Sequence, residues 1–324
     1  MRIARLTAAL VISLAVIACS GGSSSGVKQR LSIATGGTGG VFYPYGGGIA
    51  KVISENLPGV EATAEVTAAS VDNLKFLKQG TSDIAFTMAD TAQDALRGRE
   101  GFDGIGKVPV RALAVLYSSY VHLVALEGSR IERVADLRGR TVSTGAAGSG
   151  TTVLANRILS AAGLDPQQDI RAQSLGVAQS VDALKDGKIE AFFWNAGLPT
   201  ASILDLVNTP GIRARFIATE DVLPRLSQTY GSELYYTAVI PKGTYKTNPD
   251  VSVIAVANLL VVSESMPETL AHDITRLLFQ KQRELAAIHP QARELALETA
   301  LKGSPIPFHE GAIRYYRERQ VWPQ

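Results

Sequence analysis

The sequence predicts an α/β fold made of two similar lobes that are joined by two crossing strands. Short apolar runs alternate with helical patterns, which favours parallel strands connected by helices. The same order of elements and the same motif, Ser-Val-Asp-x-Leu-Lys, occur once in each half of the chain. Each half is followed by a long β-rich run that can carry the chain from one lobe to the other.

The spacing of the shared motifs supports this repeat. A Thr-Gly pair ends the first predicted strand of each half, at Thr35 and at Thr144, and the Ser-Val-Asp motif begins 35 and 36 residues later. Behind each motif an acidic residue, Asp83 or Glu190, stands three residues after a glycine. We therefore expect both halves to share one structural plan.

Each half is predicted to run strand, glycine loop, helix, strand, helix, strand. In the first half, we expect a strand at 31–35, a helix through 46–57, a strand at 60–67, and a helix and strand over 70–86. In the second half, we expect a strand at 140–145, a loop and helix over 146–164, a strand at 170–175, and a helix and strand over 180–193. Ser70 and Ser180 suit helix N-caps.

The β-rich runs are predicted to cross between the lobes near residues 121 to 126 and 235 to 240, with a separate sheet in each lobe. From about residue 248 the pattern is mostly helical, and these helices should pack on the first lobe. The predicted limits are 31–121 plus 240–324 for the first lobe and 122–239 for the second.

The N-terminus has the charged-then-apolar order of a secretory signal, which we assign to residues 1–18. Residues 16–19 resemble a bacterial lipobox, in which the cysteine, here Cys19, takes lipid. Ordinary cleavage after residue 18 is the alternative. Residues 19–30 would form a flexible tether. We expect an exported protein, periplasmic or at the cell surface, that is anchored to the membrane through lipid.

The composition of the chain excludes several classes of site and of function. Cys19 is the only cysteine, so the chain has no intrachain disulfide and no cysteine-built metal site. Without the two arginines of the signal, the 32 basic residues become 30 and equal the 30 acidic ones, which gives no electrostatic footprint for nucleic acid. None of the four histidines has a second ligand at suitable spacing. We expect no metal, no cofactor and no enzymatic activity.

The glycine-rich stretch that starts at residue 36 fits no nucleotide-binding motif. A dinucleotide fingerprint would need glycine where Phe42 stands, and no Walker-type loop occurs. However, N–H groups at helix N-termini carry partial positive charge, and glycines let a ligand approach them. We predict that the loops at 37–41 and 148–152 face each other across a cleft and hold a small organic anion. A pair of tight strand-to-helix turns is the alternative.

Polar and aromatic side chains flank these loops. Ser149 and Thr151 add hydroxyl groups to the second loop. Tyr43 or Tyr45 could stack on a flat ligand, or could pack within the lobe surface. Two residues at the end of the third predicted strand in each half should also lie near the cleft mouth. They are Met88 and Asp90 in the first half and Trp194 and Asn195 in the second.

Five blocks of the chain resemble the TAXI family of solute receptors for TRAP transporters: TGGTGGVFYPYGGGIA, SVDNLKFLKQGTSDIAF, GAAGSGTT, DGKIEAFFWNAGLPT and HEGAIRYYRE. They follow the order of the family from about Leu31 to Trp322. The resemblance implies a periplasmic-binding-protein fold of type II. It also implies delivery of an organic anion, a glutamate- or 2-oxoglutarate-like carboxylate, to the membrane subunits of a TRAP transporter.

The resemblance also implies ligand-binding residues at positions of this sequence that match the family. These are Thr38, Gly39, Tyr43, Asn73, Asp90, Ser149, Gly150, Thr151 and Gly197. Other TRAP receptors bind the substrate carboxylate with a cleft arginine, which TAXI receptors generally lack, so neither Arg111 nor Arg157 is assigned that role.

Two other classes stay open, a surface lipoprotein antigen or adhesin and an exported hydrolase. The second is the weaker, because the G-x-S-x-G pattern at 22–26 has no strand before it and no helix after it.

Overall fold

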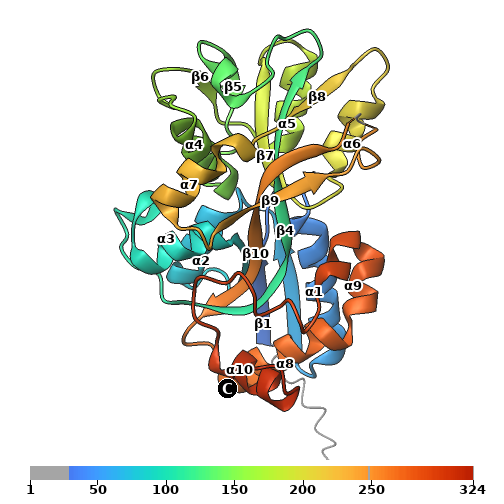
Figure 1. The fold of residues 1–324 in the computed structure, drawn as a ribbon. Coiled ribbons are helices and arrows are strands. Elements are labelled where there is room, and N and C mark those ends of the chain that lie inside the picture. The colour runs from blue at the N-terminus through green and yellow to red at the C-terminus, as the bar shows by residue number, and fades with distance from the viewer. Residues whose placement is uncertain (1–28, 247–248, 324) are drawn as a thin grey trace, which may run out of the picture.

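The computed structural model describes residues 29–246 and 249–323, so the signal peptide, Cys19 and most of the tether lie outside the described residues. Ten strands form one hydrogen-bonded sheet in the order β2-β1-β3-β10-β4-β7-β5-β6, with β8 paired to β4 and β9 to β10. The sheet extends through both lobes (Figure 1). The predicted α/β class is confirmed, but the expectation of two separate sheets is wrong.

The first lobe contains the predicted succession of strands and helices, followed by one helix that was not predicted. Its elements are β1 (Gln29–Ala34), α1 (Phe42–Asn56), β2 (Val60–Glu65), α2 (Ser70–Gln79), β3 (Ile84–Met88) and α3 (Ala89–Arg97). β1 pairs in parallel with β2 and with β3. β10 (Val251–Ser263) then pairs antiparallel with β3.

The second lobe repeats this plan. Its elements are β5 (Thr141–Ser143), α4 (Gly150–Ala161), β6 (Arg171–Gln173), α5 (Val177–Lys185) and β7 (Ala191–Ala196). β5 pairs in parallel with β6 and β7. β4 (Val110–Leu126) pairs antiparallel with β7, the place that β10 takes in the first lobe. α6 (Ala201–Asn208), β8 (Ala214–Ile217), α7 (Leu223–Tyr230) and β9 (Tyr235–Ile240) follow.

The two acidic residues that support the repeat occupy equivalent places. The Asp83 carboxylate accepts a hydrogen bond from the Ser32 N–H at 2.8 Å, and the Glu190 carboxylate accepts one from the Thr141 N–H at 2.9 Å. Each acid ties the turn before the third strand of its lobe to the first strand. The predicted duplication of plan is therefore confirmed, and both lobes share this hydrogen bond.

Neither of the serines predicted to cap a helix N-terminus does so. α2 begins at Ser70 itself, and the Ser70 hydroxyl accepts a hydrogen bond from the Met88 N–H at 3.1 Å. Ser180 lies inside α5, with its hydroxyl 2.8 Å from that of Ser143. Both serines thus join a helix to a neighbouring strand.

The segment after residue 250 is not helical as predicted, because residues 251–263 form β10. This strand is buried along nearly all of its length and rich in valine, a composition that favours a strand. A continuous apolar run cannot be assigned by periodicity alone. The helices predicted beyond it are present as α8 (Glu268–Gln280), α9 (Gln282–Ile288) and α10 (Glu310–Glu318). They share one apolar cluster with β1 and α1, so their predicted packing on the first lobe is confirmed.

The two long strands carry the chain between the lobes. β4 changes lobe at Tyr120, which pairs with Ala255 of β10 and with Ala196 of β7. The second crossing is β10 and not the run at 235–240, which is β9 and pairs with the first half of β10. Ile240 and Tyr245 pack in one cluster with second-lobe residues. We therefore propose that the second lobe also takes residues 240–254.

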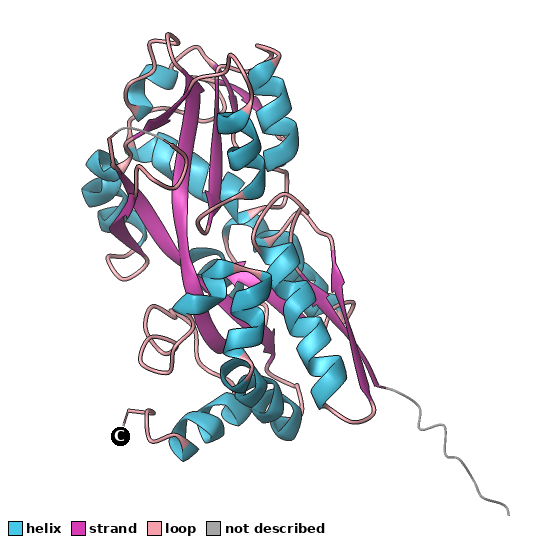
Figure 2. Ribbon diagram, turned by 90° about the vertical axis from the view of Figure 1, so that its right-hand side faces the viewer, coloured by secondary structure: helices cyan, strands magenta, loops and turns pink. Residues whose placement is uncertain are grey.

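Helices lie on both sides of the sheet (Figure 2). On one side, a single apolar cluster includes residues of α2 and α3 from the first lobe and of α4 and α7 from the second. On the other side, each lobe has a cluster of its own, beneath α1 and the C-terminal helices or beneath α5 and α6. In the part of the chain that is described, no helix combines the length and the apolar character needed to cross a membrane.

Candidate functional site

A cavity of about 30 Å³ lies between the two lobes, where the carboxyl ends of β1 and β3 meet those of β5 and β7. This is where parallel α/β sheets bind ligands. The first lobe lines it with the loop before α1, the start of α2 and the end of β3, and the second lobe with the start of α4 and the end of β7. The crossing strand β4 contributes Tyr117.

The N-terminus of α4 is the most polar side of the cavity. Ser149 is the N-cap of this helix, and its hydroxyl accepts a hydrogen bond from the Thr152 N–H at 3.1 Å. The N–H groups of the first helical turn have no partner within the helix. A Cβ built on Gly150 would lie 2.7 Å from the Ser70 hydroxyl and 2.9 Å from the Met88 sulfur. Glycine therefore allows this helix end to approach the first lobe.

Asn195 lines the cavity next to this helix end, and its side chain has no hydrogen-bond partner. The residue is 7% exposed, and neither its amide oxygen nor its amide nitrogen has a partner among the described residues. Its backbone N–H donates to the Thr151 hydroxyl at 3.3 Å. An unpaired buried amide costs free energy that a polar ligand would offset. The sequence pattern placed Asn195 near the cleft without assigning it a role.

Tyr117 is a second cavity residue with an unpaired polar atom, and the sequence analysis missed it. Its hydroxyl is buried and has no partner in the described ranges. Burial raises the pKa of this hydroxyl well above its usual value, so the group is neutral and can donate. Tyr117 lies inside the apolar run of β4, where the sequence carries no sign of a ligand site.

Aromatic rings form much of the rest of the lining. Phe42 and Tyr117 pack edge to face, with ring centroids 6.4 Å apart. The Trp194 ring is oriented by a hydrogen bond from its indole nitrogen to the Thr200 hydroxyl at 3.2 Å. No residue that lines the cavity carries a charged side chain. An anion bound there would be held by N–H, hydroxyl and amide groups.

Three of the nine predicted ligand-binding residues line this cavity: Ser149, Gly150 and Thr151. Thr38 is exposed, and Tyr43 is partly buried on α1 outside the lining, where Phe42 takes part in its place. Gly39 faces the second lobe, because its carbonyl accepts a hydrogen bond from the Ser202 hydroxyl at 3.5 Å.

Asn73 lies away from the cavity, and its amide is fully used inside the first lobe. The amide nitrogen donates to the carbonyls of Thr35 at 2.7 Å and Phe86 at 2.8 Å, and the amide oxygen accepts from the Thr67 hydroxyl at 2.6 Å. Asn73 thus joins the ends of β1 and β3.

Gly197 is also outside the cavity lining. The side chain of Gln291, from the first lobe, occupies the place that a Cβ on Gly197 would fill. The Gln291 amide oxygen accepts a hydrogen bond from the Leu198 N–H. Gly197 therefore belongs to a contact between the lobes.

Comparison with known proteins identifies the family. The family model described as NMT1-like matches residues 33–319. The chain belongs to the NMT1-like family.

Solved structures similar to this NMT1-like protein share its fold. A binding protein component of an ABC phosphonate transporter from Pseudomonas aeruginosa is 11% identical, with a TM-score of 0.53 over 82% of this chain and 79% of that chain. A protein from Bordetella bronchiseptica is 19% identical, with a TM-score of 0.52 over 91% and 90%. A protein bound to L-arginine is 14% identical, with a TM-score of 0.50 over 83% and 90%. The chain has the two-lobed α/β fold of periplasmic solute-binding proteins.

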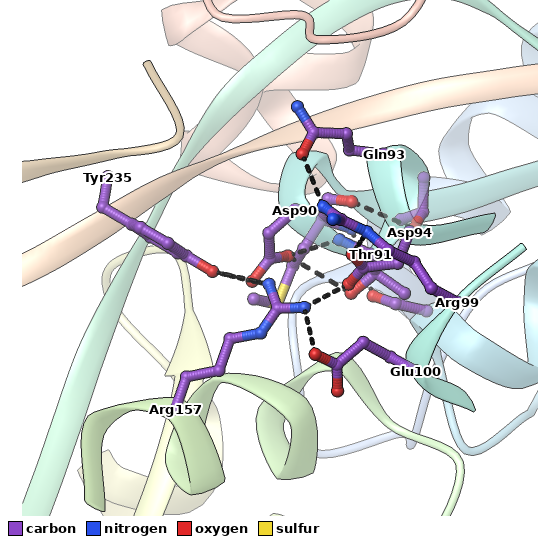
Figure 3. Close-up of polar contacts among 11 residues, drawn as sticks. Asp90, Thr91, Gln93, Asp94, Arg99, Glu100, Arg157 and Tyr235 are labelled. Carbon is purple, nitrogen blue, oxygen red and sulfur yellow. Dashed lines mark hydrogen bonds and ion pairs between the residues drawn. The ribbon is translucent and has the colours of Figure 1, made fainter. Parts of the chain in front are cut away.

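The remaining predicted residue, Asp90, belongs to a buried cluster of ion pairs in this NMT1-like protein (Figure 3). Arg157 of α4 pairs with Asp90 at 3.7 Å and with Asp94, both on α3. The Tyr235 hydroxyl accepts from Arg157 at 2.8 Å and donates to Asp90 at 2.9 Å. Glu100 lies 3.4 Å from the guanidinium. None of these residues lines the cavity.

The charges of this cluster can be assigned from their surroundings. Burial raises the pKa of Asp94 to about 6, against the opposing effect of the Arg157 guanidinium. The contact with the Arg157 guanidinium favours the ionised form of Asp94. The guanidinium also lies over the Tyr230 ring, 4.3 Å from its centroid, a favourable cation–π contact. Arg157 is thus engaged by protein groups, which agrees with assigning it no role in ligand binding.

Proposed function

We propose that this protein is an extracytoplasmic solute receptor that captures a small organic anion between its lobes and delivers it to a TRAP-type secondary transporter. The observation that carries the proposal is the unpaired Asn195 amide beside the N-terminus of α4, in a cavity to which both lobes contribute. The proposed ligand is a glutamate- or 2-oxoglutarate-like carboxylate.

The donors of the cavity suit a carboxylate. Burying an anion is costly unless its oxygens are hydrogen-bonded. Here the N–H groups of Gly150 and Thr151, the Thr151 hydroxyl and the Asn195 amide are within one side of the lining. The partial positive charge at the start of α4 adds to their effect. The site would therefore compensate a negative charge without a basic side chain.

The contacts around the cavity indicate how a ligand would enter. The Asp72 N–H of the first lobe donates to the Gly148 carbonyl of the second, and the Leu198 N–H of the second donates to the Gln291 amide oxygen of the first. We therefore expect a ligand to enter when the lobes move apart and to be enclosed when they close.

The choice of transporter rests on the five sequence blocks that resemble TAXI receptors. The fold alone does not distinguish transporter classes, since the similar structure from Pseudomonas aeruginosa is a component of an ABC transporter. A direct check is co-purification of the receptor with candidate TRAP membrane subunits in the presence of the ligand. Recovery with ABC permease subunits instead would contradict this part of the proposal.

The function is tested by a thermal-shift screen of small carboxylic acids, followed by calorimetry. A ligand at 100 times its Kd should stabilise the folded protein by about 2.7 kcal/mol. Asn195→Leu removes the amide at similar volume and should weaken binding about 10- to 150-fold, the equivalent of a lost hydrogen bond to a charged group. Asn208→Leu, on the exposed end of α6, is the matched control and should bind normally.

The outcomes separate the competing classes. If no acid stabilises the protein, the receptor proposal fails and a surface antigen or adhesin becomes the better reading. Chemical conversion of an acid or ester during the screen would favour the hydrolase. If an acid binds with equal affinity to Asn195→Leu and to the parent, the receptor stands but its site is elsewhere.

A further inference from the structure

We propose that Arg157, Asp90, Asp94 and Tyr235 form an interlobe latch that holds the two lobes closed before any ligand is bound. The inference rests on the proposed function, because it concerns the closing of the same site. The latch goes beyond the proposed function because it assigns part of the free energy of lobe closure to contacts between protein groups outside the cavity.

The latch joins the two lobes through buried charges. Arg157 comes from α4 of the second lobe, while Asp90 and Asp94 come from α3 of the first lobe. The side chain of Arg157 is 3% exposed, and those of Asp90 and Asp94 are 0% and 2% exposed. Tyr235, on β9, bridges the guanidinium and the Asp90 carboxylate. The closed arrangement thus pairs charges that separated lobes would return to water.

The balance of charge makes Arg157 the decisive member. Three carboxylates lie around it, those of Asp90, Asp94 and Glu100, whereas Arg99 is the other cation of the cluster, 3.3 Å from Asp94. Without Arg157, closure would bury Asp90 and Asp94 close together with too little positive charge. Removing one partner of a buried ion pair leaves an uncompensated charge and is strongly unfavourable. Opening the lobes relieves this cost by hydrating the carboxylates.

Other contacts between protein groups join the lobes on both sides of the cavity. The Asp72 N–H of the first lobe donates to the Gly148 carbonyl of the second at 3.1 Å. The Asp72 carboxylate occupies the place that a Cβ on Gly148 would fill. On the opposite side, Gln291 packs against Gly197 in the same manner. The glycines of these loops therefore serve the contact between lobes as well as the cavity.

The latch has a measurable consequence for binding. When the binding-competent state is only partly populated, apparent affinity falls by the populated fraction. A variant that is closed for about 1–10% of the time should bind about 10- to 100-fold more weakly than a parent that is mostly closed. Saturating ligand should still close the variant, since the cavity is unchanged.

The test measures the distance between spin labels on the two lobes without ligand. Labels are placed at Lys51→Cys on α1 and at Arg213→Cys before β8, in a chain that also carries Cys19→Ser so that no other thiol reacts. Both native side chains are largely exposed, and their ion pairs contribute little. The parent should show one closed distance, and Arg157→Met should show mainly a second, open distance.

A matched control separates the latch from general loss of an ion pair. Arg140→Met breaks the 2.7 Å pair between Arg140 and Glu190, which lies wholly within the second lobe, and should leave the closed distance unchanged. Tyr235→Phe removes only the bridging hydroxyl and should shift part of the population to the open distance. If Arg157→Met does not fold, the distances measured in Tyr235→Phe test the latch instead.

The latch would be overturned by a parent that shows the open distance without ligand. It would also be overturned if Arg157→Met kept the closed distance. If Arg157→Met does not fold, an unchanged closed distance in Tyr235→Phe would have the same meaning. Calorimetry with the acid found in the screen then measures the expected 10- to 100-fold loss. Failure of every acid to bind the parent would defeat the proposed function, while the distance measurement without ligand would still decide the latch.

Discussion

At the residue scale, His122 shows how a polar group can be buried at no loss of hydrogen bonds. Its Nδ1 lies 2.9 Å from the Tyr120 carbonyl and 3.2 Å from that of Trp194, and its Nε2 lies 3.1 Å from the Tyr245 hydroxyl. That hydroxyl accepts from the Thr200 N–H at 2.8 Å, so its proton is free to go to His122. These partners assign the ring proton to Nδ1, and the imidazole is neutral.

We predict that this histidine destabilises the protein at acidic pH. Burial lowers the pKa of His122 to about 4, below its usual 6.5. Between these values the unfolded chain binds a proton that the folded protein does not, so stability falls as pH falls through this window, by at most about 3 kcal/mol. Urea unfolding at pH 7 and pH 4.5 measures the effect.

The control for this prediction is a histidine near the surface. His122→Phe should flatten the dependence of unfolding free energy on pH, whereas His272→Gln on α8 should keep the larger part of it. An equally steep dependence in His122→Phe and in the parent would show that other groups cause it.

At the element scale, the N-terminus of α4 links sequence, stability and the cavity. The Ser149 hydroxyl caps the helix and lies 3.2 Å from the Thr152 hydroxyl, which itself donates to the Ala146 carbonyl. Ser149 therefore orders the turn that presents the N–H groups of Gly150 and Thr151, and its own hydroxyl is occupied. Ser149 stays a predicted ligand-binding residue, but its hydroxyl is engaged by Thr152 within this turn.

We predict that Ser149→Ala lowers the unfolding free energy by about 1 kcal/mol, the usual cost of losing an N-cap. Chemical denaturation measures the loss. Ser160→Ala, an exposed position near the end of the same helix, should have little effect. A fully stable Ser149→Ala protein would mean that the cap contributes nothing to this helix.

At the scale of the whole molecule, the lipobox-like residues 16–19 are the proposed site of membrane attachment. We predict that Cys19→Ala releases the protein into the soluble fraction, because stable anchoring requires the acyl chains. Fractionation followed by a salt wash tests this, with Ser20→Ala as the control that should stay with the membrane. Retention of Cys19→Ala in the washed membranes would contradict the lipobox assignment.

Local patterns determined the α/β class, the repeated plan of the two lobes and the place of residues 149–151 at the cavity, because each depends on residues close together in the chain. The acidic residue three residues after a glycine, Asp83 or Glu190, is a local sign of this repeat. The assignment of the apolar run at 251–263 was not determined in this way. Strand and buried helix have the same composition there, and only pairing with β3, β4 and β9 decides between them.

The tertiary structure alone decided which polar groups meet between the lobes. Asp94 and Arg157 are 63 residues apart in the chain, and Gly197 meets Gln291 from the far end of the sequence. Asn73 and Asn195 are chemically identical, yet one amide is fully paired inside a lobe and the other, beside the cavity, has no partner among the described residues. A side chain is free for a ligand only when the fold brings it no other partner, and the sequence does not record those distant neighbours.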